Sequence, residues 1–160
     1  SLVIARPTKE EGICLFEAEK RILEGTMPCV SIVGIGPGDE RYLPDRAKIL
    51  IDEAEAIVGA KRMLIRKGVK SLISYRPDEI MAWLENCYRQ GIRKMVCLMN
   101  GDTGFFSGTN KLLEKLEEKG WRAEVIPGIS SISYFASKIF NCIGKDFFVW
   151  IAQIFAHSNP

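Results

Sequence analysis

Residues 95–108 read MVCLMNGDTGFFSG, and this stretch decides the fold class of the chain. Its first part, from Met95 to Met99, is an unbroken apolar run without polar alternation. Such a run suits a strand that is buried on both faces, as in a parallel sheet covered by helices. A glycine-rich turn follows at once, and a helical pattern begins at Thr109. The stretch therefore predicts a β-strand, a loop and a helix, in that order.

Two other stretches have the same design. The β-type run from Val30 to Ile35 leads into Gly36-Pro37-Gly38-Asp39, and residues 125–131 read VIPGISS. Tight turns between strands and helices often need glycine, so one such loop is weak evidence for a site. Ligands of open α/β sheets, however, lie outside the carboxyl ends of the strands. Three glycine loops at strand ends therefore favour one shared binding crevice.

The rest of the chain alternates between strand patterns and helix patterns. Further strands are predicted at residues 56–59, 71–75 and 122–126, and helices at residues 45–54, 77–90, 109–119 and 130–140. In the first of these helices, apolar residues recur at the spacing of a helix packed on a sheet, at Ala47, Leu50, Ile51 and Ala54. The alternation predicts an α/β fold, a parallel sheet flanked by helices on both sides.

Composition restricts the class of protein. A chain of 160 residues with 47% hydrophobic and 26% charged residues fits one globular domain with a real core. A formal net charge of +2 gives no case for a nucleic-acid partner. The longest apolar run, residues 147–152, is too short to span a bilayer, and residues 1–26 lack the apolar core of a signal peptide. We therefore expect a cytoplasmic protein without a membrane partner.

Cysteine and histidine usage narrows the chemistry further. The cysteines are odd in number and form no C-x-x-C pair: Cys14, Cys29, Cys87, Cys97 and Cys142. Free thiols in a reducing compartment are the expected state. The single histidine, His157, argues against a histidine-based catalytic triad and against a multi-histidine metal site. We expect no metal.

The first glycine loop resembles a dinucleotide-binding loop but departs from it. Asp39 stands at the position where the G-x-G-x-x-G pattern needs its third glycine, and Pro37 removes a backbone N–H that a pyrophosphate would use. The central loop, with Asp102, has no Gly-Lys-Ser/Thr of a P-loop. Carboxylates in these loops suit a ligand with positive charge or hydroxyl donors. S-adenosylmethionine offers an ammonium, a sulfonium and a ribose diol.

Taken together, these segments resemble the tetrapyrrole (corrin/porphyrin) methylase family. The resemblance covers roughly residues 29–144 and rests on residues 33–39 with Tyr42-Leu43, residues 58–62, residues 101–108 and residues 126–135. Most of the family has Asp-Pro after the central glycine. Asp102-Thr103-Gly104 is instead similar to the branch that methylates ring carbon C5 of cobalt-precorrins.

The resemblance implies binding sites for two molecules. It implies S-adenosylmethionine contacts at Pro37, Asn100, Gly101, Asp102, Phe105, Ser130 and Ser131. It implies a corrinoid (precorrin) substrate over the same crevice, for which we assign Gly36, Asp39, Arg41, Lys61 and Arg62. No catalytic residue is assigned, because an electron-rich ring carbon of the substrate would attack the S-methyl group in line. A solvated helix face is the alternative explanation for the charges of residues 61–67.

The implied domain plan divides the chain into three parts. Residues 1–28 are expected to be an N-terminal extension, residues 29–144 the N-terminal domain of a tetrapyrrole methylase, and residues 145–160 a divergent tail, with the family's second domain absent. The expected function is S-adenosylmethionine-dependent C-methylation of a precorrin at C5 in cobalamin biosynthesis. The alternatives are a methylase for another ring position and a truncated, non-catalytic remnant. A homodimer is left open.

Overall fold

The computed structural model describes residues 27–61, 68–104 and 108–138. Five strands lie in this part of the chain: β1 (Cys29–Gly34), β2 (Ala56–Gly59), β3 (Lys70–Ile73), β4 (Met95–Met99) and β5 (Arg122–Ile126). The helices are the short 3₁₀ helix η1 (Glu40–Tyr42), α2 (Asp45–Glu53), α3 (Pro77–Arg89), α4 (Thr109–Glu118) and α5 (Ser131–Lys138). The expected extension up to residue 26 and the expected tail lie outside the described residues.

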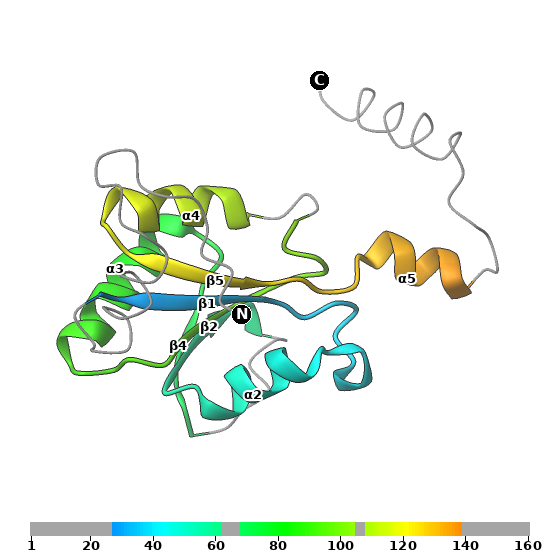
Figure 1. Ribbon diagram of the computed structural model, residues 1–160, viewed down its shortest axis with the longest axis horizontal. Helices are drawn as coiled ribbons and strands as arrows, with labels where there is room; N and C mark the ends of the chain where they lie inside the picture. Colours follow the sequence, from blue (N-terminus) through cyan, green and yellow to red (C-terminus); the bar gives the residue numbers. More distant parts are fainter. Residues whose placement is uncertain (1–26, 62–67, 105–107, 139–160) are drawn as a thin grey trace.

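The strands form one parallel sheet in the order β3-β2-β4-β1-β5. Helix α2 covers one face, and α3 and α4 cover the other (Figure 1). This confirms the predicted α/β class and the predicted parallel sheet. From β1 the chain continues to β2, toward the β3 edge of the sheet. From β4, the neighbour of β1, it continues to β5, at the opposite edge of the sheet. The strand order therefore reverses between β1 and β4, which is where open α/β sheets bind ligands.

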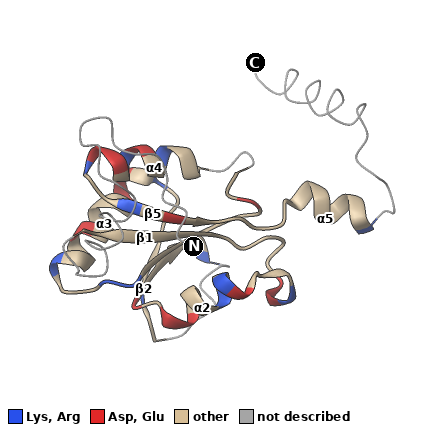
Figure 2. Ribbon diagram, viewed as in Figure 1, with Lys and Arg blue, Asp and Glu red and all other residues tan. Residues whose placement is uncertain are grey.

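Strand β4 lies in the middle of the sheet and is buried on both faces. From Met95 to Leu98, no residue is more than 3% exposed. On one face its side chains belong to the same core as Leu84 of α3 and Leu112 of α4, and on the other to the same core as Ala47 of α2. The charged residues gather on the helices and in the connecting segments (Figure 2). The unbroken apolar run therefore has the predicted cause, burial on both faces of the sheet.

Two elements differ from the predicted pattern. The expected strand at residues 71–75 ends at Ile73, because the Ser74 hydroxyl accepts a bond from the Arg76 N–H and donates to Glu79, which turns the chain into α3. Helix α5 buries only Ala136, and Phe135 is 62% exposed. This helix lies beyond the end of the sheet (Figure 1), so no sheet face is there to receive its apolar side.

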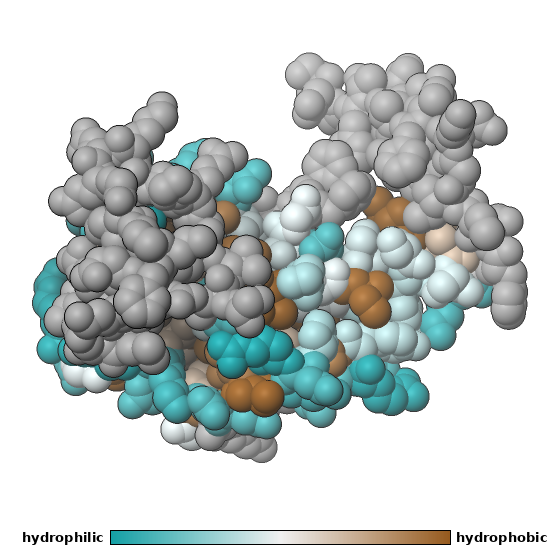
Figure 3. Space-filling view, viewed as in Figure 1, coloured by the Kyte–Doolittle hydropathy of each residue, from teal (hydrophilic) through white to brown (hydrophobic). Residues whose placement is uncertain are grey.

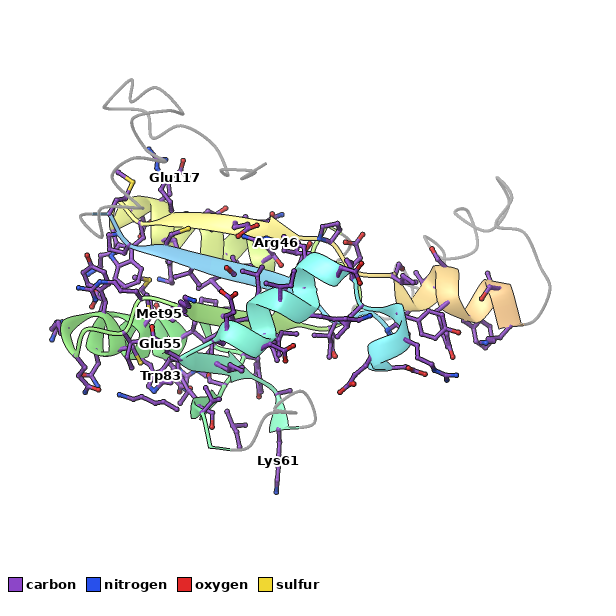
Figure 4. All side chains as sticks on the ribbon, turned by 60° about the horizontal axis from the view of Figure 1, so that its bottom comes forward. Arg46, Glu55, Lys61, Trp83, Met95 and Glu117 are labelled. Atoms are coloured by element: carbon purple, nitrogen blue, oxygen red, sulfur yellow. The ribbon has the colours of Figure 1, made fainter. Side chains whose placement is uncertain are left out.

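A partly buried ion pair connects α2 to the edge strand β5. The Arg46 guanidinium donates two bonds to the Glu124 carboxylate, at 2.8 Å and 2.9 Å. Glu124 is 5% exposed, and Figure 4 shows Arg46 on the side of α2 that faces β5. Burial, and secondarily the charge of Glu124, raises the pKa of the neighbouring Cys29 thiol to about 11. Both oxygens of the buried Glu124 side chain therefore have a hydrogen-bond partner on α2.

One further expectation is met within the described part of the chain. The cysteines described there, Cys29, Cys87 and Cys97, are free thiols, as predicted. Among the helices of the described ranges, none has the length and apolar character needed to cross a membrane. Met27 is 6% exposed, and the Pro28 carbonyl accepts a bond from the Arg122 N–H, so the chain is already packed on the domain at these residues.

Candidate functional site

The loops after β1 and β4 are joined by backbone hydrogen bonds. The Ile35 N–H donates to the Met99 carbonyl at 2.9 Å. Gly36 and Gly101 then exchange two bonds, N–H to carbonyl, at 3.0 Å and 3.2 Å, in an antiparallel bridge. Both glycines have positive φ, +62° and +61°, a region that side-chain-bearing residues rarely adopt. The two loops therefore turn back together at the point where the strand order reverses.

The loop after β5 packs against this pair without space for a side chain. A Cβ atom on Gly128 would lie 2.3 Å from the Gly101 carbonyl oxygen and 2.6 Å from the Gly34 carbonyl oxygen. A Cβ atom on Gly34 would lie 2.7 Å from the Gly128 nitrogen. The buried Thr103 adds a side-chain bond, from its hydroxyl to the Ile126 carbonyl at 3.4 Å. The three loops predicted from the sequence therefore meet in one close-packed junction.

Asp102 lies half-buried in the central loop. Its Oδ1 accepts a bond from the Gly104 N–H at 3.1 Å, an aspartate turn that holds the carboxylate against its own loop. Asn100, at the end of β4, is exposed, and Pro37 in the first loop is half-buried. The predicted contact at Phe105 lies outside the described residues.

Asp39 has a partner that the sequence analysis did not assign. It accepts bonds from the Arg41 backbone N–H at 2.9 Å and from the Arg41 guanidinium, at 2.6 Å for the shortest. These bonds lower the pKa of Asp39 to about 2. The negative charge of Asp39 is therefore matched by its neighbour, so the electrostatic argument against a pyrophosphate rests on Asp102. A substrate carboxylate at Arg41 would have to compete with Asp39.

The serines of the third loop begin helix α5. The Ser130 hydroxyl accepts a bond from the Ile132 N–H at 3.3 Å, as expected for a residue that caps a helix, and Ser131 is exposed. In addition, Tyr42 of η1 contacts Tyr134 of α5 edge to face, with ring centroids 5.2 Å apart. This contact ties the segment after the first loop to the helix after the third.

The structure does not bring all predicted residues together. Gly36, Pro37, Gly101, Asp102 and Ser130 belong to the junction or to the loops that form it. Lys61 follows β2, which β4 separates from β1, and its side chain projects outward from the body of the domain (Figure 4). Arg62 lies outside the described residues.

A cavity next to the junction was not predicted. It measures about 320 Å³ and lies at the carboxyl ends of β2 and β4, beside the start of α3 and α4. Its lining carries no charged side chain among the described residues: Val58, Gly59, Ala60, Ser74, Tyr75, Pro77, Ile80, Cys97, Leu98, Met99, Asn100, Gly108 and Leu112. Two of its lining residues, Ser74 and Tyr75, were assigned to the preceding strand in the sequence analysis.

Fold and site define the class of protein before any comparison. A parallel α/β sheet, with glycine loops joined at its reversal point, is typical of domains that bind a nucleotide-like ligand. Comparison with known proteins then identifies the family. The chain belongs to the tetrapyrrole (corrin/porphyrin) methylases, whose family model matches residues 30–148.

Three similar proteins illustrate this membership. The chain is 36% identical over 114 residues to the probable cobalt-precorrin-7 C(5)-methyltransferase of Methanocaldococcus jannaschii, covering 69% of this chain and 54% of that protein. It is 30% identical over 112 residues to the cobalt-precorrin-4 C(11)-methyltransferase of the same organism, covering 64% and 43%. The structure of uroporphyrin III C-methyltransferase from Thermus thermophilus, complexed with S-adenosylhomocysteine, aligns with a TM-score of 0.54 at 25% identity, covering 64% and 46%.

The chain therefore spans about half the length of these relatives, between 43% and 54%.

On the face shown in Figure 3, hydrophobic side chains form separate patches between hydrophilic ones. The exposed Phe135 and Ile129 belong to α5 and to the loop that leads into it.

Proposed function

We propose that this protein binds S-adenosylmethionine at the three-loop junction and takes part in methylating ring carbon C5 of a cobalt-precorrin in cobalamin biosynthesis. The observation that carries the proposal is the junction itself, in which Gly34, Gly101 and Gly128 lock the three loops together at the reversal of strand order. Family membership and the S-adenosylhomocysteine complex of a similar structure support the choice of ligand.

The residues at the junction fit a cationic nucleoside better than a dinucleotide. The Asp102 carboxylate is held in place by the Gly104 N–H and can accept a bond from a ribose hydroxyl or lie near a positive charge. Pro37 offers no N–H to a phosphate. The loops therefore lack two features that a pyrophosphate needs, a full set of backbone donors and freedom from nearby negative charge.

The chemistry proposed for this site is transfer by alignment. The donor supplies an electrophilic methyl group, and the acceptor supplies an electron-rich ring carbon. The chain's part is to hold the ligand in one orientation, and the loops suit this because their backbones cannot move apart independently. Correct alignment alone can lower a barrier by about 7–11 kcal/mol in favourable intramolecular cases, so no covalent intermediate is required.

The ring position rests on two observations. Identity is higher to the C(5) enzyme, 36%, than to the C(11) enzyme, 30%. In addition, Asp102-Thr103-Gly104 resembles the C5 branch, where most of the family has Asp-Pro. Methylation at another ring position is the second candidate.

Titration calorimetry tests which ligand the three-loop junction binds. We expect the protein to bind S-adenosylhomocysteine and to prefer it to NAD. Asp102→Asn removes the charge and keeps the shape, and loss of a charge-assisted hydrogen bond should cost about 1.5–3 kcal/mol, or about 10- to 150-fold in affinity. Asp52→Asn is the matched control, because Asp52 is exposed on α2, and it should bind as the wild type does. Preference for NAD, or undiminished affinity in Asp102→Asn, would refute the proposal.

A second experiment tests the ring position. The protein is incubated with a donor carrying a ¹³C-methyl group and with a cobalt-precorrin acceptor, and the product is read by NMR. Label at C5 is expected. Label at C11 would assign the protein to the second candidate, and absence of label despite donor binding would refute catalysis by this chain.

A further inference from the structure

The uncharged cavity shares residues with the loop that carries Asp102. Strand β4 lies between β1 and β2 in the sheet. Its end, at Met99 and Asn100, therefore borders the first loop on one side and the cavity on the other. At about 320 Å³, the cavity is at the lower end of the range for small-molecule sites, roughly 300–1,000 Å³. It can hold part of a large ligand.

Tyr75 stands at the rim of this cavity. It belongs to the cavity lining, yet it is 87% exposed. The backbone around it is anchored, because the buried Ser74 hydroxyl donates to Glu79 at 2.8 Å and accepts from the Arg76 N–H at 3.1 Å. An exposed aromatic ring on an anchored backbone, beside an uncharged cavity, is suited to contact the flat face of a conjugated ligand.

The charges around the cavity agree with a ligand that is apolar inside and anionic at its rim. No charged side chain is among the described lining residues. The exposed Arg76 directly follows the lining residue Tyr75 in the chain, whereas the Lys61 side chain projects outward from the domain (Figure 4). Arg76 also pairs with Glu79 at 2.9 Å on the surface, where such a pair is weak and can rearrange.

We propose that this cavity receives one edge of the tetrapyrrole acceptor, with Tyr75 against the face of the macrocycle and a carboxylate side chain of the macrocycle toward Arg76. The inference rests on the proposed function, because it takes the three-loop junction as the donor site. An acceptor must reach the donor's methyl group, and this cavity borders the central loop through Asn100. Tyr75 is then a positioning and specificity-determining residue for the acceptor.

The test uses uroporphyrin III, a stable tetrapyrrole with carboxylate side chains, titrated into the protein while its visible absorption is followed. Tyr75→Ala should weaken porphyrin binding about fivefold or more, the usual size of an aromatic contact. Tyr75→Phe keeps the ring and should stay within about twofold. Ile49→Ala, which shortens an exposed apolar side chain on α2 away from the cavity, should have no effect. S-adenosylhomocysteine affinity should be unchanged in all three variants.

Each contrary result has a distinct meaning. Equal porphyrin affinity in Tyr75→Ala and wild type would overturn the inference, as would a wild-type protein that binds S-adenosylhomocysteine and no porphyrin. Loss of S-adenosylhomocysteine affinity in Tyr75→Ala would also overturn it, because the cavity would then hold part of the donor. Failure of the wild type to bind S-adenosylhomocysteine would refute the proposed function itself.

Discussion

Replacement of Gly128 by alanine should disrupt the junction on which the site depends. The added Cβ would lie 2.3 Å from the Gly101 oxygen, 2.6 Å from the Gly34 oxygen and 2.7 Å from the Gly34 carbonyl carbon. Ordinary van der Waals contacts of a Cβ atom begin at 3.4 Å, so the first of these overlaps is roughly 1 Å. All three neighbours are backbone atoms of strand ends or loops that are bonded to one another, so none can rotate away.

The expected cost follows from this geometry. Overpacking a well-ordered core costs about 1–3 kcal/mol, and a clash with backbone on two sides belongs at the upper end of that range. We predict that Gly128→Ala lowers the free energy of unfolding by about 3 kcal/mol, or the melting temperature by about 6–12 °C for a chain of this size. Urea unfolding followed by circular dichroism measures the change. S-adenosylhomocysteine binding should weaken in parallel, because the loops would separate.

The matched control is Gly108→Ala. A Cβ atom there meets nothing within 4 Å, and the backbone has an ordinary φ of −67°. Gly108 is the N-cap residue of α4, where alanine is less favourable than glycine, so the free energy of unfolding should remain within about 1 kcal/mol of the wild type. Equal stability of Gly128→Ala and Gly108→Ala would refute the account of the junction.

Two other predictions concern charges. Arg46→Leu leaves the buried Glu124 without its guanidinium partner. Breaking a fully buried pair costs about 3–5 kcal/mol. Because Arg46 is half-exposed, we expect the free energy of unfolding, measured with urea, to fall by about 1–3 kcal/mol. Lys48→Leu, which removes only an exposed pair with Asp45, should change the free energy of unfolding by less than about 0.5 kcal/mol. Equal effects of Arg46→Leu and Lys48→Leu would contradict the stabilising role of the Arg46–Glu124 pair. The second prediction concerns Asp39, whose pKa is lowered to about 2 by hydrogen bonds from Arg41. The contribution of this pair to the stability of the fold is therefore complete above the ordinary pKa of 3.8 and is lost as the pH falls through about 2. NMR titration of the Asp39 carboxyl should show the low pKa in the wild type and a value near the ordinary one in Arg41→Gln; an ordinary value in both would show that the pair does not form in solution.

The fold could be predicted from the sequence because its signals are local. An unbroken apolar run needs burial on two faces, and the run from Met95 to Met99 has that burial at the centre of the sheet. The helix before β2 was predicted from the spacing of Ala47 and Ile51, and both are buried. Glycine loops at strand ends were predicted to converge, and a parallel sheet leaves them no alternative, since all carboxyl ends lie at one edge.

The details that could not be predicted depend on packing between distant segments. Nothing local shows that Gly34 and Gly128 touch, because that contact follows from β5 pairing with β1. The choice of partner for Arg41 was equally undetermined, since Asp39 and a substrate carboxylate offer the same chemistry. The cavity beside Asn100 arises where two helices begin against two strand ends, so no single stretch of sequence encodes it. The apolar face of α5 was predictable from its sequence. Its exposure was not, because that depends on α5 lying beyond the end of the sheet.

The central claim is that the loops after β1, β4 and β5 form one binding site for S-adenosylmethionine. The most direct measurement is a titration of the ¹⁵N-labelled protein with S-adenosylhomocysteine, followed by amide chemical shifts. We predict that the largest changes fall at residues 36–39, 100–104 and 128–131 and saturate together with one dissociation constant, while residues 88–94, at the opposite end of the sheet, do not move. Changes confined to one loop, changes centred on residues 88–94, or a response to NAD with none to S-adenosylhomocysteine would contradict the claim.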